Sequence, residues 1–284
     1  MTDRQLSAAA TVPLHYRIDG DAGAAAERLV LIHPVGLDHT CFDGLVAALG
    51  AGVAVLRMDL RGHGRSPVAP SPDGVRGYAR DVHALLATTR FAPAVVVGFS
   101  FGGMVAQWLA VTFPADVAAL VAGACACTFT NEQRRMLEER GEAARRDGMS
   151  AIVEPTLERW FSEGFRRGPG IAPFRQRLLD DSPEGWAQAW QAIAALDVAD
   201  HLGAISVPAL CLAADADTAA PPPIVAAMAA RIAGSRLVVV LNASHMLFIE
   251  EPDAVAAEIR RFLMSTLSMG TRKRPCSMRR LPST

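Results

Sequence analysis

The feature that most constrains the fold is an apolar strand that runs directly into a glycine-bounded turn and then into a helix. Residues 94–103 read AVVVGFSFGG, and an apolar helical pattern follows. Glycines on either side of Ser100, at Gly98 and Gly102, allow the strand and the helix to pack closely around a sharp turn. The pattern therefore predicts an α/β unit that holds the Ser100 hydroxyl at the end of the strand.

Short apolar runs alternate with helical patterns along most of the chain. The runs of strand length are residues 29–32, 53–58, 94–97, 120–122, 210–213 and 237–241. The helical patterns are residues 42–49, 75–89, 104–112, 222–232 and 254–263. Most runs are continuous, which is typical of central parallel strands covered on both faces. We therefore expect a mostly parallel, doubly wound α/β sheet, with residues 14–18 as an edge hairpin strand.

One long segment interrupts this alternation. Residues 129–197 have no strand-like run, are helical in composition, and carry three of the four tryptophans, Trp160, Trp186 and Trp190. We expect a helical cap insertion here, between core segments 1–128 and 198–266. Residues 267–284 contain several arginines and no acid, and we expect them to form a basic, disordered tail.

The composition excludes several classes of protein. A chain that is 51% hydrophobic and 20% charged can bury a core, and a net charge of −1 favours neither nucleic acid nor an acidic membrane as a partner. We find no pattern of a signal peptide or a membrane span. The five cysteines are scattered and lack metal-site spacing, so we expect a reducing cytoplasm as the location and no bound metal. We expect the partner of the protein to be a small-molecule substrate.

A serine nucleophile needs a base, and the base needs an orienting acid. His245 is the one histidine that follows a late predicted strand by a short loop and precedes the last helix. The acid should lie in the loop after the preceding strand, which contains Asp215 and Asp217. We favour Asp217 because it lies farther from the strand end and can reach across; Asp197 is a more remote alternative. The predicted triad is Ser100, Asp217 and His245.

Acyl transfer also needs backbone N–H groups that stabilise an oxyanion. One predicted donor is Phe101, the residue after the serine. The other should come from the loop after residues 29–32, where Pro34 has no N–H and Val35 is the natural candidate. We expect His33 to hold this loop by hydrogen bonding, and residues 59–66 to form a scaffold loop.

Four segments carry a resemblance to a known family: HPVGLD at 33–38, DLRGHGRS at 59–66, GFSFGG at 98–103 and NASHM at 242–246. Across roughly residues 14–264 the chain resembles the α/β-hydrolases and, among them, the 3-oxoadipate enol-lactonase-like group. The resemblance implies the α/β-hydrolase fold, the same triad, a helical cap and no cofactor. It also implies that two cap residues, Arg159 and Trp160, meet a carboxylate of the substrate.

These features lead us to expect a serine hydrolase that cleaves an ester or enol-lactone bond of a small, carboxylated substrate through an acyl-enzyme. Two other enzymes could use the same triad: a general carboxylesterase and a carbon–carbon bond hydrolase of ring-cleavage products. A ligand receptor built on the hydrolase fold is the non-enzymatic alternative. Ser100 at the turn argues against epoxide hydrolases and dehalogenases of this fold, which have an aspartate there.

Overall fold

The computed structural model describes residues 11–25 and 27–270. Within them, seven strands form one sheet in the order β1-β3-β2-β4-β5-β6-β7. Every neighbouring pair is parallel except β1 with β3. The strands are β1 (Tyr16–Asp19), β2 (Glu27–Ile32), β3 (Val53–Met58), β4 (Ala94–Phe99), β5 (Val117–Gly123), β6 (Ala209–Ala214) and β7 (Arg236–Val240). The expected mostly parallel α/β sheet is confirmed.

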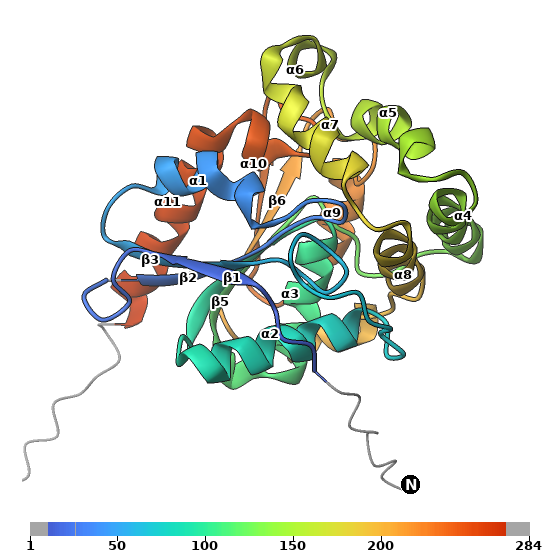
Figure 1. The fold of residues 1–284 in the computed structure, drawn as a ribbon. Helices are drawn as coiled ribbons and strands as arrows, with labels where there is room; N and C mark the ends of the chain where they lie inside the picture. Colours follow the sequence, from blue (N-terminus) through green and yellow to red (C-terminus); the bar gives the residue numbers. More distant parts are fainter. Residues whose placement is uncertain (1–10, 26, 271–284) are drawn as a thin grey trace, which may run out of the picture.

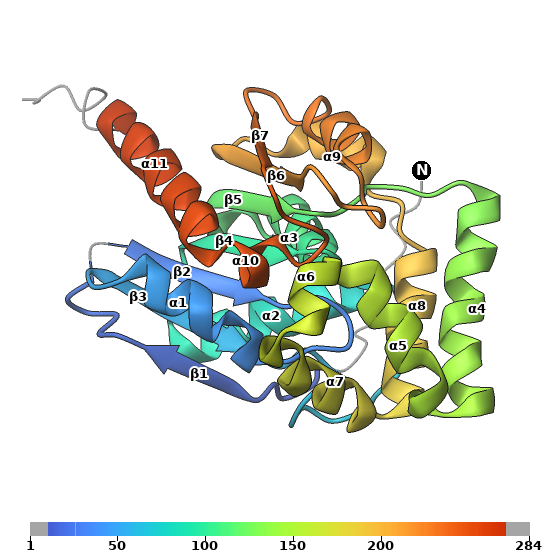
Figure 2. The same cartoon turned by 90° about the horizontal axis from the view of Figure 1, so that it is seen from above.

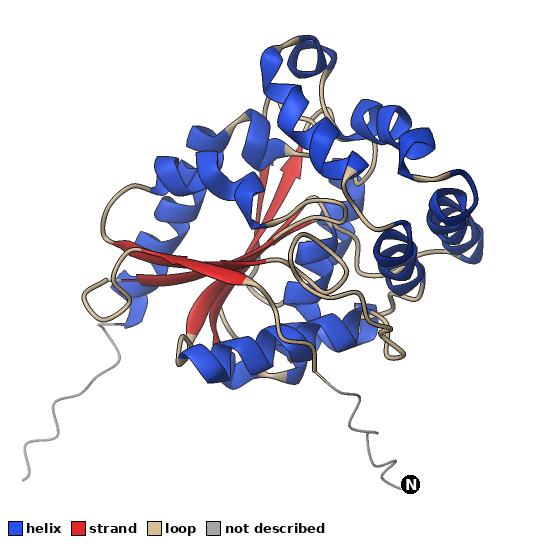
Figure 3. Ribbon diagram, viewed as in Figure 1, coloured by secondary structure: helices blue, strands red, loops and turns tan. Residues whose placement is uncertain are grey.

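Helices cover both faces of this sheet (Figures 1 and 3). The helices of the sheet layer are α1 (Asp43–Leu49), α2 (Val75–Thr89), α3 (Phe101–Thr112), α9 (Pro222–Ala229), α10 (Leu247–Glu250) and α11 (Pro252–Gly270). Helices α1 and α11 pack together on one face, and α2 packs with α3 on the other. Strands β4 and β6 are buried along their whole length, which explains their continuous apolar sequences. No helix of the described residues has the length and apolar character needed to cross a membrane.

The expected hairpin at the start of the chain is wrong, although the strand does lie at the edge. Strand β1 pairs with β3 in antiparallel register, with Tyr16 opposite Met58, and not with β2, the next strand in sequence. Strand β2 already has β3 and β4 as parallel neighbours. The mostly exposed β1 can therefore add only to the outer side of β3.

Five α-helices lie between β5 and β6, beyond the end of the sheet toward which the parallel strands run (Figure 2). They are α4 (Asn131–Asp147), α5 (Met149–Trp160), α6 (Glu163–Arg167), α7 (Ala172–Leu179) and α8 (Pro183–Ala194). The segment leaves and returns at one place, where Thr128 and Asp197 form an antiparallel bridge and the Thr128 hydroxyl donates to Asp197 Oδ1 at 3.1 Å. We propose that residues 129–197 form a cap on this core.

Helix α11 overlaps the segment that we expected to form the tail. It continues through Gly270, past residue 267, where we expected the tail to begin. The sequence LSM at 267–269 contains no helix breaker, so the helix can propagate through it. The remainder of the expected tail, residues 271–284, lies outside the described residues.

A close backbone approach joins the cap to the core. Gly185 in α8 lies against Gly62 in the loop after β3, and a Cβ at Gly185 would overlap the Gly62 carbonyl oxygen. Both partners are backbone atoms, so neither can rotate away. Gly36, with φ of +73°, makes a similar approach, because a Cβ there would lie 2.5 Å from Trp186 of the cap. Small residues therefore set the distance between cap and core.

We expect Gly185→Ala to destabilise the protein, because the new methyl group must push α8 away from the loop that contains Gly62. Overpacking of this kind costs about 1–3 kcal/mol in the free energy of unfolding. Chemical denaturation measures this free energy directly. The matched control is Gly164→Ala in α6, where a Cβ meets nothing within 4 Å. Equal stability of the two variants would contradict the proposed role of the contact.

Candidate active site

Ser100 lies at the strand-to-helix turn between β4 and α3. Its φ of 52° and ψ of −119° are strained for a residue with a side chain, and its N–H donates to the Gly123 carbonyl at 2.8 Å. At the glycines on either side of Ser100, the surrounding backbone leaves no room for a residue with a side chain. A Cβ at Gly98 would overlap the carbonyl of Gly102, and a Cβ at Gly102 would overlap that of Ile32. The packing of two strands and a helix therefore holds Ser100 in place.

The structure brings the three residues of the predicted triad together. His245 Nε2 lies 2.9 Å from Ser100 Oγ, and His245 Nδ1 lies 2.8 Å from Asp217 Oδ2. All three side chains are buried. Asp217 follows β6 and His245 follows β7, and these parallel neighbours end at the same edge of the sheet as β4. The arrangement is a continuous hydrogen-bonded path from hydroxyl to imidazole to carboxylate.

Asp217 is held in its ionised form. Its Oδ1 accepts N–H groups from Ala219 at 2.7 Å and Ala220 at 2.9 Å. Burial acts to raise the pKa of Asp217, but the charge and hydrogen bond of His245 and the two N–H donors outweigh it, so the pKa is lowered. A carboxylate in this position stabilises the imidazolium that forms when His245 takes a proton.

The two alternative acids lie elsewhere. Asp215 is exposed, and its Oδ1 accepts the N–H of Ala243 at 3.2 Å, so it braces the loop before His245. Asp197 lies at the base of the proposed cap, where it accepts the hydroxyl of Thr128. Neither carboxylate has a hydrogen bond to His245.

The two expected oxyanion donors occupy suitable backbone positions. Phe101 is the first residue of α3, so its N–H has no carbonyl partner inside the helix. Val35 lies in the loop after β2, lines the cavity next to Ser100, and donates its N–H to none of the described residues. Both N–H groups are therefore available to a negatively charged oxygen near Ser100.

His33 holds the loop of Val35, as the sequence led us to expect. Its Nε2 accepts the N–H of Leu60 at 2.8 Å, so its Nδ1 carries the proton and donates to the Pro34 carbonyl at 2.7 Å. Burial and the neighbouring His63 lower the pKa of His33 to about 4. A neutral imidazole at neutral pH keeps both hydrogen bonds, and His33 therefore acts as a brace for the loop.

A cavity of about 310 Å³ opens over Ser100 and His245. Its walls are mostly apolar and come from both the core and the proposed cap; they include Met104, Phe129, Leu137, Trp160, Trp190 and Ile224. Both Arg159 and Trp160, the two expected cap residues, line it. The space suits a small organic molecule whose reacting bond meets Ser100.

A second arginine, which sequence reasoning missed, lies beside Arg159. Arg140 of α4 also lines the cavity, and its guanidinium carbon lies 5.3 Å from the centre of the Trp190 ring. Burial, with a contribution from the charge of Arg159, lowers the pKa of Arg140 to about 10. Within the described residues, neither guanidinium has an ion pair or a side-chain hydrogen bond. Two cations without counterions thus line the cavity, of which Arg140 is half-buried and Arg159 is exposed to solvent.

The loop that carries His245 is tied to the end of α5, and Glu250 makes much of this connection. The carbonyl of Trp160 accepts the Ser244 hydroxyl at 3.0 Å and the Met246 N–H at 3.1 Å. Glu250 accepts the N–H of Ser244 and the N–H of Ser162, both at 2.7 Å. Sequence reasoning missed Glu250 because its contact with Ser162 joins segments far apart in the chain.

Comparisons with known proteins show the family of the chain. Residues 29–258 match the model of the alpha/beta hydrolase family. 3-Oxoadipate enol-lactonase 1 of Acinetobacter baylyi is 31% identical, over 84% of this chain and 89% of that protein. A pimeloyl-[acyl-carrier protein] methyl ester esterase of Neisseria meningitidis is 29% identical, over 86% of this chain and 78% of that protein.

A solved structure gives the same result. The enol-lactonase of Burkholderia xenovorans LB400 superposes with a TM-score of 0.83 and 33% identity, and the match covers 88% of this chain and 96% of that one. The matched family model spans most of β2, all of the strands from β3 to β7, the turn at Ser100 and the loop of His245. The chain therefore belongs to the alpha/beta hydrolase family and is a hydrolytic enzyme.

Proposed function

We propose that this enzyme cleaves an ester or lactone bond through an acyl-enzyme formed on Ser100. The observation that carries the proposal is the hydrogen-bonded path from Ser100 Oγ through His245 to Asp217 beneath a mostly apolar cavity. The names of the relatives, an enol-lactonase and a methyl ester esterase, support this bond type.

Each residue of the path has a defined role in the proposed mechanism. His245 Nε2 accepts the Ser100 proton as Oγ attacks the substrate carbonyl, and Asp217 stabilises the imidazolium. The N–H groups of Val35 and Phe101 stabilise the oxyanion. His245 then gives its proton to the departing oxygen, which leaves the acyl group on Ser100. In the second half, His245 deprotonates a water molecule that attacks this acyl group, and Ser100 recovers its proton.

The two arginines favour a substrate that carries a carboxylate. Arg140 and Arg159 are cations without partners in a cavity with apolar walls, and an anionic group would neutralise them. Hydrolysis of an enol-lactone that carries a carboxylate would release an enol. The enol tautomerises to a ketone, and this step makes the hydrolysis irreversible. The apolar part of the cavity also supports a carboxylesterase as the second candidate. A panel of aryl esters, enol-lactones and vinylogous diketones would separate these activities from carbon–carbon hydrolysis and from ligand binding without turnover.

We expect Ser100→Ala to remove ester hydrolysis while the fold is kept, because the alanine deletes only the attacking oxygen. Turnover should fall by about 10⁴-fold or more. Hydrolysis of an aryl acetate gives the rate, and circular dichroism checks the fold. A variant that kept a tenth of the wild-type turnover would rule out the proposed mechanism.

Asp217→Asn and Asp215→Asn test the choice of acid. An asparagine at 217 would favour the wrong tautomer of His245, and the comparable change in a serine protease lowers turnover by about 10⁴-fold. Asp215→Asn is the matched control, since it alters an exposed carboxylate two residues away that contacts only backbone. The two turnover numbers should differ by orders of magnitude, and the reverse ranking would refute the assignment.

Arg159→Ala tests the recognition of a carboxylate. Loss of one charge-assisted hydrogen bond, about 1.5–3 kcal/mol, should raise KM for an acidic lactone or ester by roughly ten- to a hundredfold. A neutral aryl acetate should show little change. Arg146→Ala is the control, because Arg146 is an exposed cap arginine paired with Glu139 and Asp147 outside the cavity. Equal effects on both substrates would mean that Arg159 supports only the structure of the cap.

A further inference from the structure

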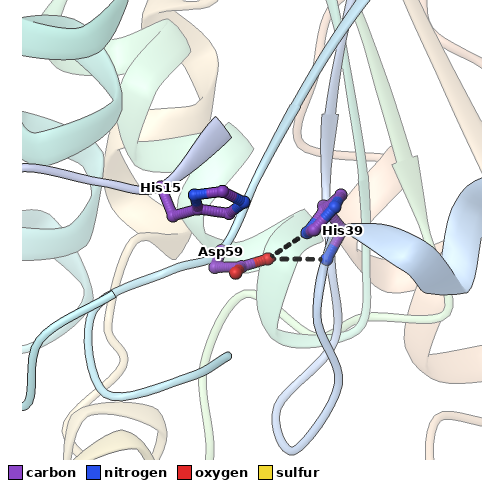
Figure 4. Close-up of side chains that lie close together, drawn as sticks. All are labelled: His15, His39 and Asp59. Atoms are coloured by element: carbon purple, nitrogen blue, oxygen red, sulfur yellow. Dashed lines mark hydrogen bonds and ion pairs between the residues drawn. The ribbon is translucent and has the colours of Figure 1, made fainter. Parts of the chain in front are cut away.

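We propose that His15, His39 and Asp59 form a binding site for a divalent transition metal ion, with zinc as the expected occupant. The three side chains lie together at the end of β3 (Figure 4). The sequence alone predicted no metal, because the three positions are scattered and fit no metal-ligand spacing. The proposal is independent of the hydrolytic reaction.

The sheet topology brings the three residues together. The register of β1 with β3 places Tyr16 opposite Met58, so His15 and Asp59 become neighbours, and the Asp59 N–H donates to the His15 carbonyl at 2.8 Å. His39 begins a short 3-10 helix, η1 (His39–Phe42), after the loop of β2, and its N–H donates to Asp59 Oδ1 at 2.9 Å. Hydrogen bonds from the backbone N–H groups of Asp59 and His39 therefore hold the three chain segments together.

The donor atoms are close enough for a shared ion. His39 Nδ1 lies 2.6 Å from Asp59 Oδ1, and one donor atom of each residue lies within 4.8 Å of the other two. Zinc bonds of about 2.0–2.2 Å in tetrahedral geometry place ligand atoms about 3.3 Å apart. A bound ion would therefore replace the proton between His39 Nδ1 and Asp59 Oδ1, which would move apart, and side-chain rotation of His15 would bring in the third donor. Two imidazoles and one carboxylate suit zinc, and water would take the fourth position.

The contacts of these groups hold the carboxylate in place. The buried Asp59 accepts hydrogen bonds from the backbone N–H groups of His39 and Arg65, both at 2.9 Å. The His15 ring has no hydrogen bond within the described residues, so it is free to coordinate. Both histidines are half-buried, which gives an ion access and partial shielding from water.

A positive charge beside the site is already neutralised. Arg57 donates from Nη1 to the His39 carbonyl at 3.1 Å, so its guanidinium lies close to the proposed site. It also pairs with Asp19, at 2.8 Å, and with Asp43. Asp19 also pairs with Arg17 at 2.7 Å, so these two carboxylates balance the two arginines, and the carboxylate of Asp59 supplies the negative charge for a bound dication.

The ion would have a structural role. None of the three residues lines the cavity over Ser100, so a bound zinc ion could not supply a nucleophile there. It would join the start of β1, the end of β3 and the chain just after the loop that holds Val35. We therefore expect zinc to stabilise the native state, as any ligand that binds only that state does.

The test is zinc binding to the full chain after treatment with a chelator, followed by calorimetry and thermal unfolding. We expect one zinc ion per chain and a Tm that rises with zinc concentration. His15→Gln should weaken zinc binding by about 100-fold or more, since loss of even an outer-sphere partner costs about 10–100-fold. The Tm of this variant without zinc should stay near that of the wild type, because the His15 ring has no hydrogen bond to lose.

A control and a second variant make the test decisive. His83→Gln alters another histidine–aspartate pair, with Nδ1 2.5 Å from Asp116 Oδ2, that has no third donor in the described residues. It should bind zinc like the wild type. His39→Gln should lose binding as His15→Gln does, and cobalt should give a tetrahedral absorption spectrum only when both histidines are present. Failure of the wild type to bind zinc, or undiminished binding by both variants, would overturn the proposal.

Discussion

The rest of the site depends on the close packing of backbone around Ser100. A side chain at Gly98 would overlap the carbonyl of Gly102, and one at Gly102 would overlap the carbonyl of Ile32. Ser100 itself has a positive φ that an unconstrained chain would avoid. This strain persists because β2, β4 and α3 pack against one another around the turn. The loops after β2, β6 and β7, which end at the same edge of the sheet as β4, carry Val35, Asp217 and His245.

The proposed catalytic groups belong to the core, but the proposed cap holds them in position. The carbonyl of Trp160 and the carboxylate of Glu250 tie the loop of His245 to the cap, and Trp186 packs against Gly36 next to Val35. A change in the cap can therefore alter both the shape of the cavity and the placement of the imidazole. These contacts therefore couple substrate choice to turnover, although Arg140 and Arg159 are separate from the proposed reacting groups of Ser100 and His245.

Much of the fold and of the proposed site was predictable from the chain because the signals are local. The apolar strands, the turn at Ser100 and the short loop before His245 each depend on neighbouring residues. The choice of Asp217 over Asp215 also followed from the distance of each residue from a strand end. The edge strand was predicted as part of a hairpin, and this was wrong because its partner, β3, is chosen by the whole sheet.

The sequence by itself determined the α/β architecture, the candidate nucleophile and its predicted partners, since strand and helix periodicity and glycine-bounded turns are properties of short segments. Only the tertiary structure decided which distant residues meet. Arg140 reaches the cavity beside Arg159 from another helix, Glu250 joins the loop of His245 to Ser162, and His15 meets His39 and Asp59 across β1 and β3. The local sequence around each of these residues does not mark it as part of a site. Their proposed roles depend on distances and charges that exist only after the sheet, the loops and the helices over them have packed together.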